Sequence, residues 1–150
     1  MGWTYFAKHG AGPSGPEAEN AYLARSYTRE GQSIVASAVC RSLAGNSAVW
    51  YAVLETRRYG KDDALMDTPI RTALVVLIDR AGGWGEKGMD ESMGPNESAM
   101  PAAMLRLLTP LDEIERLTGW NMEYARAWRG RCGRHEPKGQ AALPLAAAEG

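Results

Sequence analysis

The apolar and polar positions divide the chain into a strand-rich first part and a helical last part. Residues 32–43 mix β-branched with small side chains, and residues 48–56 alternate between two faces. A turn-forming stretch, 44–47, lies between them, so the two segments predict an antiparallel hairpin. In the second strand, one face would carry Val49, Tyr51 and Val53, and the other Trp50, Ala52 and Leu54.

A third strand is predicted over residues 72–78, and it is apolar on both faces. A run of this kind is typical of a central strand that is covered on both sides. The aromatic segment 2–8 predicts a short first strand. Ser14 and Glu17 have the spacing of a capping box, which predicts a helix between this strand and the hairpin.

After the third strand the periodic pattern stops. Residues 79–100 contain five glycines and Pro95, which predicts a long Gly-rich loop. Helical spacing then resumes after Pro101 and after Thr109-Pro110, where Thr109 is expected to cap a helix that ends at Gly119.

A last helix is predicted over residues 121–132, with Tyr124, Ala125 and Trp128 on its apolar side. The whole order predicts an α+β fold. An antiparallel sheet of three to four strands (β-α-β-β-β) is followed by the Gly-rich loop and by C-terminal helices on one face.

Length and composition fit one globular domain. The chain has 150 residues, of which 45% are hydrophobic, and we expect a domain over 1–132 and a flexible tail over 133–150. The two cysteines and the absence of a signal-peptide pattern favour a cytoplasmic protein, and no apolar run is long enough for a bilayer. A net charge of −1 argues against a histone-like nucleic-acid binder.

The Gly-rich loop holds the first candidate site. Asp90 or Glu91 could serve as a general base, and Lys87 could hold an anionic substrate. The same carboxylates could instead cap a helix or accept N–H bonds inside the loop. Adjacent carboxylates in an extended chain point to opposite sides, which argues against a dyad of these two. Trp84, at the start of the loop, is a candidate contact for a ligand or partner, or else a residue that anchors the loop on the sheet.

The basic C-terminal segment is the second candidate. Between residues 126 and 138, five Lys or Arg residues face one Glu, and Arg126, Arg129 and Arg131 lie on the last helix beside Trp128. Such a helix can hold a phosphate backbone and stack a base. It can equally bind the acidic segment 86–123 of its own chain, or simply suit the helix dipole.

No metal or cofactor site is predicted. Cys132 and His135 have a C-x-x-H spacing, but a structural zinc site needs four ligands and the chain offers no matching second pair. We expect Cys40 to be a small buried residue in its strand, and Trp50 and Trp128 to belong to the core.

The run from Trp84 to Pro95, WGEKGMDESMGP, resembles the signature of a family of small uncharacterised bacterial proteins, GYKDMDESMGP after an aromatic residue. The initial MGW, WYAV, LLTP and AWRGRC support the resemblance, which covers most of residues 1–132. Glu86 replaces the tyrosine of that signature and Gly88 its first aspartate. The resemblance implies an accessory protein of phages or plasmids, and it supplies no activity.

Two functions follow from these patterns. The leading hypothesis is a small binding module that contacts a protein, or alternatively a nucleic acid, through residues 82–100 and 126–138. The alternative is a small hydrolase or transferase with Asp90 or Glu91 as general base. The sequence does not indicate the oligomeric state.

Overall fold

The computed structural model describes the chain in six stretches, residues 4–8, 15–41, 47–59, 64–80, 83–91 and 100–133. Its strands are β1 (Thr4–Lys8), β2 (Gln32–Arg41), β3 (Ser47–Tyr59), β4 (Ala64–Asp79) and β5 (Trp84–Asp90). Its helices are α1 (Gly15–Ser26), α2 (Ala102–Leu105), α3 (Leu111–Thr118) and α4 (Glu123–Cys132).

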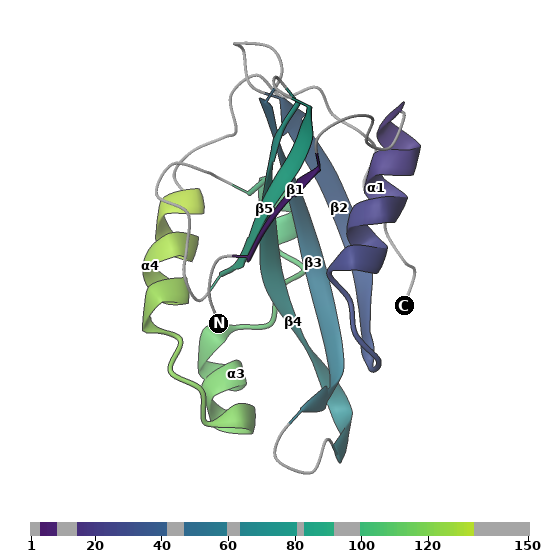
Figure 1. Ribbon diagram of the computed structural model, residues 1–150. Coiled ribbons are helices and arrows are strands. Elements are labelled where there is room, and N and C mark those ends of the chain that lie inside the picture. Colours follow the sequence, from purple (N-terminus) through teal and green to yellow (C-terminus); the bar gives the residue numbers. More distant parts are fainter. Residues whose placement is uncertain are drawn as a thin grey trace.

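The strands form one antiparallel sheet in the order β1-β5-β4-β3-β2 (Figure 1). The predicted α+β fold with an antiparallel sheet is therefore confirmed. The predicted hairpin is β2–β3, where Val39 lies opposite Trp50. The third predicted strand is the second half of β4, which pairs with β3 on one side and β5 on the other.

The sheet has five strands, one more than predicted, because the first half of the expected Gly-rich loop is β5. This strand lies between β1 and β4, with Gly88 opposite both Thr4 and Val76. Pairing on both sides holds the backbone extended even where glycine supplies no side chain to pack. The loop prediction is thus wrong for residues 84–90, and residues 92–99 lie outside the described part.

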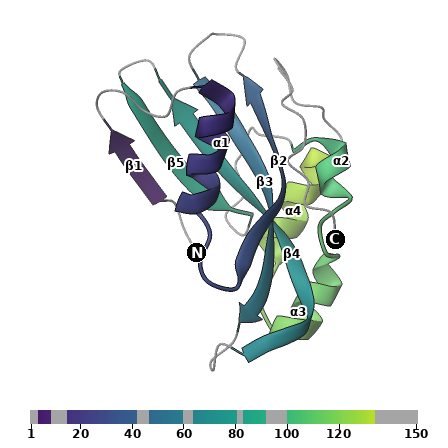
Figure 2. The same cartoon turned by 90° about the vertical axis from the view of Figure 1, so that its right-hand side faces the viewer.

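Helices cover both faces of the sheet (Figure 2). On one face, Leu23 of α1 packs with Trp50, Val76 and Trp84. On the other face, α2 and α4 contribute Met104 and Trp128 to a cluster with strand residues. The C-terminal helices therefore share one face as predicted, and α1 lies on the opposite one.

The alternation within the strands matches the prediction. Val49, Tyr51 and Val53 of β3 belong to the cluster under α2 and α4, whereas Trp50 and Ala52 belong to the cluster under α1. In β4, Ala73 and Val75 likewise face α2 and α4, and their neighbours Leu74 and Val76 face α1. The strand with two apolar faces is covered on both, as its sequence indicates.

The helix boundaries follow proline and glycine. Pro101 and Pro110 precede α2 and α3, and Gly119 ends α3 with a φ of 78°, a left-handed conformation that glycine adopts at little cost. Thr109 makes no cap hydrogen bond to α3, so that prediction is wrong; its side chain bonds to β4 instead. The proposed cap at Ser14 lies outside the described residues.

The buried side of α4 is also different from the prediction. Ala125, Trp128 and Cys132 are buried, but Tyr124 is 72% exposed. The spacing of Tyr124 and Trp128 is helical, yet the sheet contacts the row that passes through Ala125, Trp128 and Cys132. The described helices include none with the length and apolar character needed to cross a membrane.

Candidate functional site

Trp84 belongs to the junction between α1 and the sheet. Its indole Nε1 donates a hydrogen bond to Glu19 Oε2 at 3.2 Å, and its ring meets Tyr22 edge-on with centroids 5.2 Å apart. Glu19 is buried, and Arg80 donates to both of its carboxylate oxygens. Trp84 is therefore a buried residue of β5 that anchors α1 on the sheet.

Lys87 and Asp90 lie on opposite faces of β5. Lys87 is exposed and stands opposite Leu77, while Asp90 is half-buried and stands opposite Leu74, on the face that α1 covers. Glu91, the next residue, points to α4 on the other face. Asp90 and Glu91 are thus directed apart, as expected for neighbours in an extended chain.

Glu91 is fully buried, where its carboxylate accepts three hydrogen bonds and its backbone N–H donates a fourth. Arg129 of α4 donates from Nε to Glu91 Oε2 at 2.7 Å and from Nη2 to Oε1 at 2.6 Å. The Ala73 N–H donates to the same Oε1 at 3.0 Å, and the backbone of Glu91 donates back to the Ala73 carbonyl at 3.1 Å. Both oxygens of this carboxylate are engaged in a two-pronged ion pair.

Arg129 also reaches the segment between α2 and α3. Its Nη1 donates to the Thr109 carbonyl at 2.6 Å. Thr109 in turn exchanges hydrogen bonds with Arg71 of β4. The Thr109 N–H donates to the Arg71 carbonyl at 3.0 Å, and the Arg71 N–H donates to the Thr109 hydroxyl at 2.8 Å. Where β5 ends, the open edge of β4 is thus completed by the Glu91 side chain at Ala73 and by Thr109 at Arg71.

We call this group of residues the buried junction; it comprises Arg71, Ala73, Glu91, Thr109 and Arg129. Two predicted site residues, Glu91 and Arg129, have a structural role in it. It fixes α4 and the α2–α3 connection on the sheet. To act as a general base, Glu91 would have to turn a carboxylate oxygen away from Arg129 or from the Ala73 N–H. A turn away from Arg129 would leave its largely buried guanidinium without a carboxylate partner. The geometry therefore makes Glu91 and Arg129 positioning groups for the helical layer.

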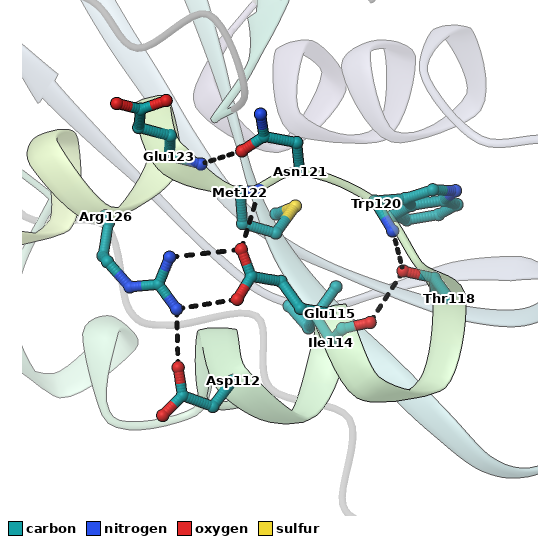
Figure 3. Close-up of polar contacts among 9 residues, drawn as sticks. All are labelled: Asp112, Ile114, Glu115, Thr118, Trp120, Asn121, Met122, Glu123 and Arg126. Carbon is teal, nitrogen blue, oxygen red and sulfur yellow. Dashed lines mark hydrogen bonds and ion pairs between the residues drawn. The ribbon is translucent and has the colours of Figure 1, made fainter.

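Arg126, three residues before Arg129, lies on the exposed side of α4 (Figure 3). Its guanidinium donates to Glu115 at 2.8 and 3.1 Å and to Asp112 at 2.5 Å, and both acceptors belong to α3. Glu115 also accepts the Met122 N–H at 3.1 Å. Hydrogen bonding to Arg126, and then to Met122, lowers the pKa of the Glu115 carboxyl.

The predicted basic surface is therefore largely neutralised within the described residues. Arg126 pairs with carboxylates of α3, and Arg129 pairs with Glu91. These contacts match the second interpretation of the basic segment, in which its arginines bind the acidic segment 86–123 of the same chain. Arg131 is half-buried near the end of α4. Residues 134–138, including His135, lie outside the described part.

Two exposed aromatic residues were not predicted as a site. Trp120 is 40% exposed and Tyr124 is 72% exposed, and they flank the start of α4. The Trp120 N–H donates to the Thr118 hydroxyl at 3.0 Å, which fixes the backbone of the turn after α3 (Figure 3). Ala125, Trp128 and Cys132 follow one another at spacings of three and four residues, and this helical row leaves Tyr124 out. That spacing is the sequence signal that could have placed Tyr124 outside the core.

Tyr27 packs over Gly88 on the α1 face of β5. A Cβ at Gly88 would overlap the Tyr27 ring. Burial raises the pKa of the Tyr27 hydroxyl, and the buried Glu86 carboxylate beside it raises this pKa further. Glu86 and Gly88 are thus both neighbours of Tyr27.

Cys40 and Cys132 are buried in the same cluster, and neither forms a disulfide bond. Burial raises the pKa of the Cys40 thiol to about 11, and Cys132 Sγ accepts the Met100 N–H at 3.4 Å. Cys40 is the buried strand residue that the sequence predicts. Within the described stretches, no three potential ligands of the His, Cys, Asp or Glu type come together to hold a metal.

Comparison of the chain with protein-family models, with curated proteins and with solved structures found no match.

Proposed function

We propose that this chain is a protein-binding module that contacts its partner through the start of α4 and the adjacent α3. We call this region the α3–α4 surface; it comprises Asp112, Glu115, Trp120, Glu123, Tyr124 and Arg126. One observation carries the proposal. In the described part of the chain, Trp120 and Tyr124 are the large apolar side chains left exposed, and both lie here. Aromatic side chains of this kind are enriched among the residues that dominate binding energy at protein interfaces.

The charges of this region support a protein partner over a nucleic acid. Arg126 is already bonded to two carboxylates of α3, and Arg129 is enclosed with Glu91. A phosphate backbone would have to displace these internal carboxylates to gain the same contacts. Arg126 and Arg129 therefore have less positive charge available for a phosphate backbone than a count of arginines in α4 indicates.

The resemblance of the WGEKGMDESMGP run to the bacterial family adds a biological setting. It supports an accessory protein of a mobile element that acts on a host protein. Lys87 and Asp90 keep a place in the proposal because they belong to that run, which residues 92–95 complete. They are tested separately below from the α3–α4 surface.

The experiment places a photo-crosslinking amino acid at position 124 and identifies the protein crosslinked in the native host. The purified partner is then titrated with the wild-type chain and with Trp120→Ala, Tyr124→Ala and the double variant. We expect each single variant to weaken the Kd by about 30-fold, and the double variant to weaken it further, since hot-spot aromatics contribute about 2 kcal/mol each.

Arg25→Ala serves as the matched control, because Arg25 is exposed on α1, on the opposite face of the sheet. A parallel Lys87→Ala/Asp90→Ala variant tests whether the end of β5 contributes. An unchanged Kd for the Trp120→Ala/Tyr124→Ala variant, with its fold intact by circular dichroism, would contradict the proposal.

A further inference from the structure

The α3–α4 surface carries more negative than positive charge. Asp112, Glu115 and Glu123 face one guanidinium, that of Arg126, which leaves a net charge of −2. The neighbouring Glu113 and Arg116 pair with each other and add no net charge. The exposed aromatic side chains therefore lie in an acidic setting.

The carboxylates differ in what they can still accept. Glu115 is saturated, because Arg126 and the Met122 N–H engage both of its oxygens. Asp112 contacts Arg126 through Oδ1, and its side chain is 93% exposed. Glu123 is exposed, and its backbone N–H, rather than its carboxylate, takes part in the hydrogen bond to Asn121 Oδ1.

The Tyr124 ring is accessible along the helix. Tyr124 lies in the first turn of α4 and is 72% exposed, so most of its ring is open to a partner. An open aromatic face beside carboxylates attracts a guanidinium or ammonium group both through its quadrupole and through charge.

We propose that the α3–α4 surface binds a cationic segment of the partner protein, with arginine or lysine side chains placed on Tyr124 and beside Glu123 and Asp112. This inference rests on the proposed function and specifies the chemistry of the partner. Charge complementarity selects this partner, because an acidic peptide or a nucleic acid would bring like charge to the same carboxylates.

The test uses the full chain and a fluorescent oligo-arginine peptide as probe, followed by fluorescence anisotropy. Oligo-lysine, oligo-glutamate and glycine-serine peptides of equal length are compared, together with mixed-sequence DNA and RNA. We expect oligo-arginine to bind most tightly, and its affinity to fall as salt is added.

Two variants localise the binding. Glu123→Lys reverses an exposed charge of the α3–α4 surface, and we expect it to weaken peptide binding by roughly tenfold. Tyr124→Ala should weaken it by about two- to fivefold, the size of an exposed cation–π contact. Glu17→Lys makes the same charge reversal at an exposed position of α1, so it has the same effect on net charge. We expect it to leave the affinity within a factor of two of the wild-type value.

Equal weakening by Glu123→Lys and Glu17→Lys would overturn the inference, as would tighter binding of oligo-glutamate, DNA or RNA. The two proposals fail separately. If the partner crosslinked at position 124 binds through a neutral segment and oligo-arginine does not bind, the interaction function stands and the cationic partner is excluded. If the Trp120→Ala/Tyr124→Ala variant binds that partner as the wild type does, the interaction surface itself is wrong.

Discussion

Two arginines of the same helix, three residues apart, form ion pairs of opposite character. Arg129 is 15% exposed and its partner Glu91 2%, whereas Arg126 is 47% exposed and its two-pronged partner Glu115 32%. Both guanidinium groups make short, two-pronged contacts with a carboxylate. The two pairs therefore differ in burial much more than in hydrogen-bond geometry.

Burial determines what each pair does. In the buried junction, removal of one partner leaves a charge away from water, so the pair is a condition for docking of the helices on the sheet. At the α3–α4 surface, water replaces a lost partner at little cost, so the pair mainly arranges the charges of an exposed surface. The helix thus contributes to stability on one side and to recognition on the other.

The largest expected effect comes from breaking the buried pair. Glu91→Ala and Arg129→Ala should each lower the free energy of unfolding by about 3–5 kcal/mol, because each leaves an unpaired buried charge. Urea denaturation followed by tryptophan fluorescence measures the loss. The double variant should cost clearly less than the two single losses added together, since the pair is removed as a unit.

Lys87→Ala is the control for these variants, because Lys87 is an exposed residue of β5, the strand that Glu91 directly follows. If Glu91→Ala lowered the free energy of unfolding no more than Lys87→Ala does, the buried junction would not be what holds the helices on the sheet.

A second variant separates charge from shape. Arg129→Lys keeps the positive charge but loses the planar group that reaches both Glu91 oxygens and the Thr109 carbonyl. We expect a loss of about 1.5–3 kcal/mol, the value of a hydrogen bond to a charged group. Arg126→Lys should have almost no effect on the unfolding midpoint, and similar losses for the two lysine variants would argue against the contrast.

A third variant asks whether the other face of β5 is as closely packed as the face with Glu91. Gly88→Ala puts a methyl group into the Tyr27 ring, and overpacking of this kind costs about 1–3 kcal/mol. In a Tyr27→Ala background the same change should cost much less. Thermal unfolding of the four variants measures the coupling, and additive losses would mean that Tyr27 is not the residue that restricts position 88.

The strands and helices with regular periodicity could be predicted from the sequence. The alternation in β3, the two apolar faces of β4 and the end of α3 at Gly119 are all local patterns, and the structure contains them. β5 was missed because its two internal glycines and its charged residues are typical of a loop. Its stability comes from β1 and β4, which lie far away in the sequence.

The site residues were harder to predict for the same reason. Glu91 is a plausible base only until its partner is known, and that partner, Arg129, lies 38 residues further along the chain. Trp84 depends in the same way on Glu19, 65 residues before it. Tyr124 was assigned to the core because its spacing to Trp128 is helical, and only the docking direction of α4 shows that it is exposed. Burial of a polar residue depends on distant partners, which composition and spacing do not contain.

The smallest expected effect concerns the exposed pair and its pH dependence. Since Arg126 lowers the pKa of Glu115 below the ordinary value of 4.5, the pair contributes stability above that pH and loses it as the pH falls through the lower pKa of the folded state. Arg126→Ala should therefore unfold at a slightly lower urea concentration than the wild type at neutral pH, and the two midpoints should converge as the pH falls below the folded-state pKa of Glu115. Added salt should shrink the neutral-pH difference in the same way, because the pair is exposed. A difference that persists in acid and in high salt would mean that Arg126 stabilises the fold through packing of its alkyl chain against α3, and the contrast with Arg129 would then be one of degree.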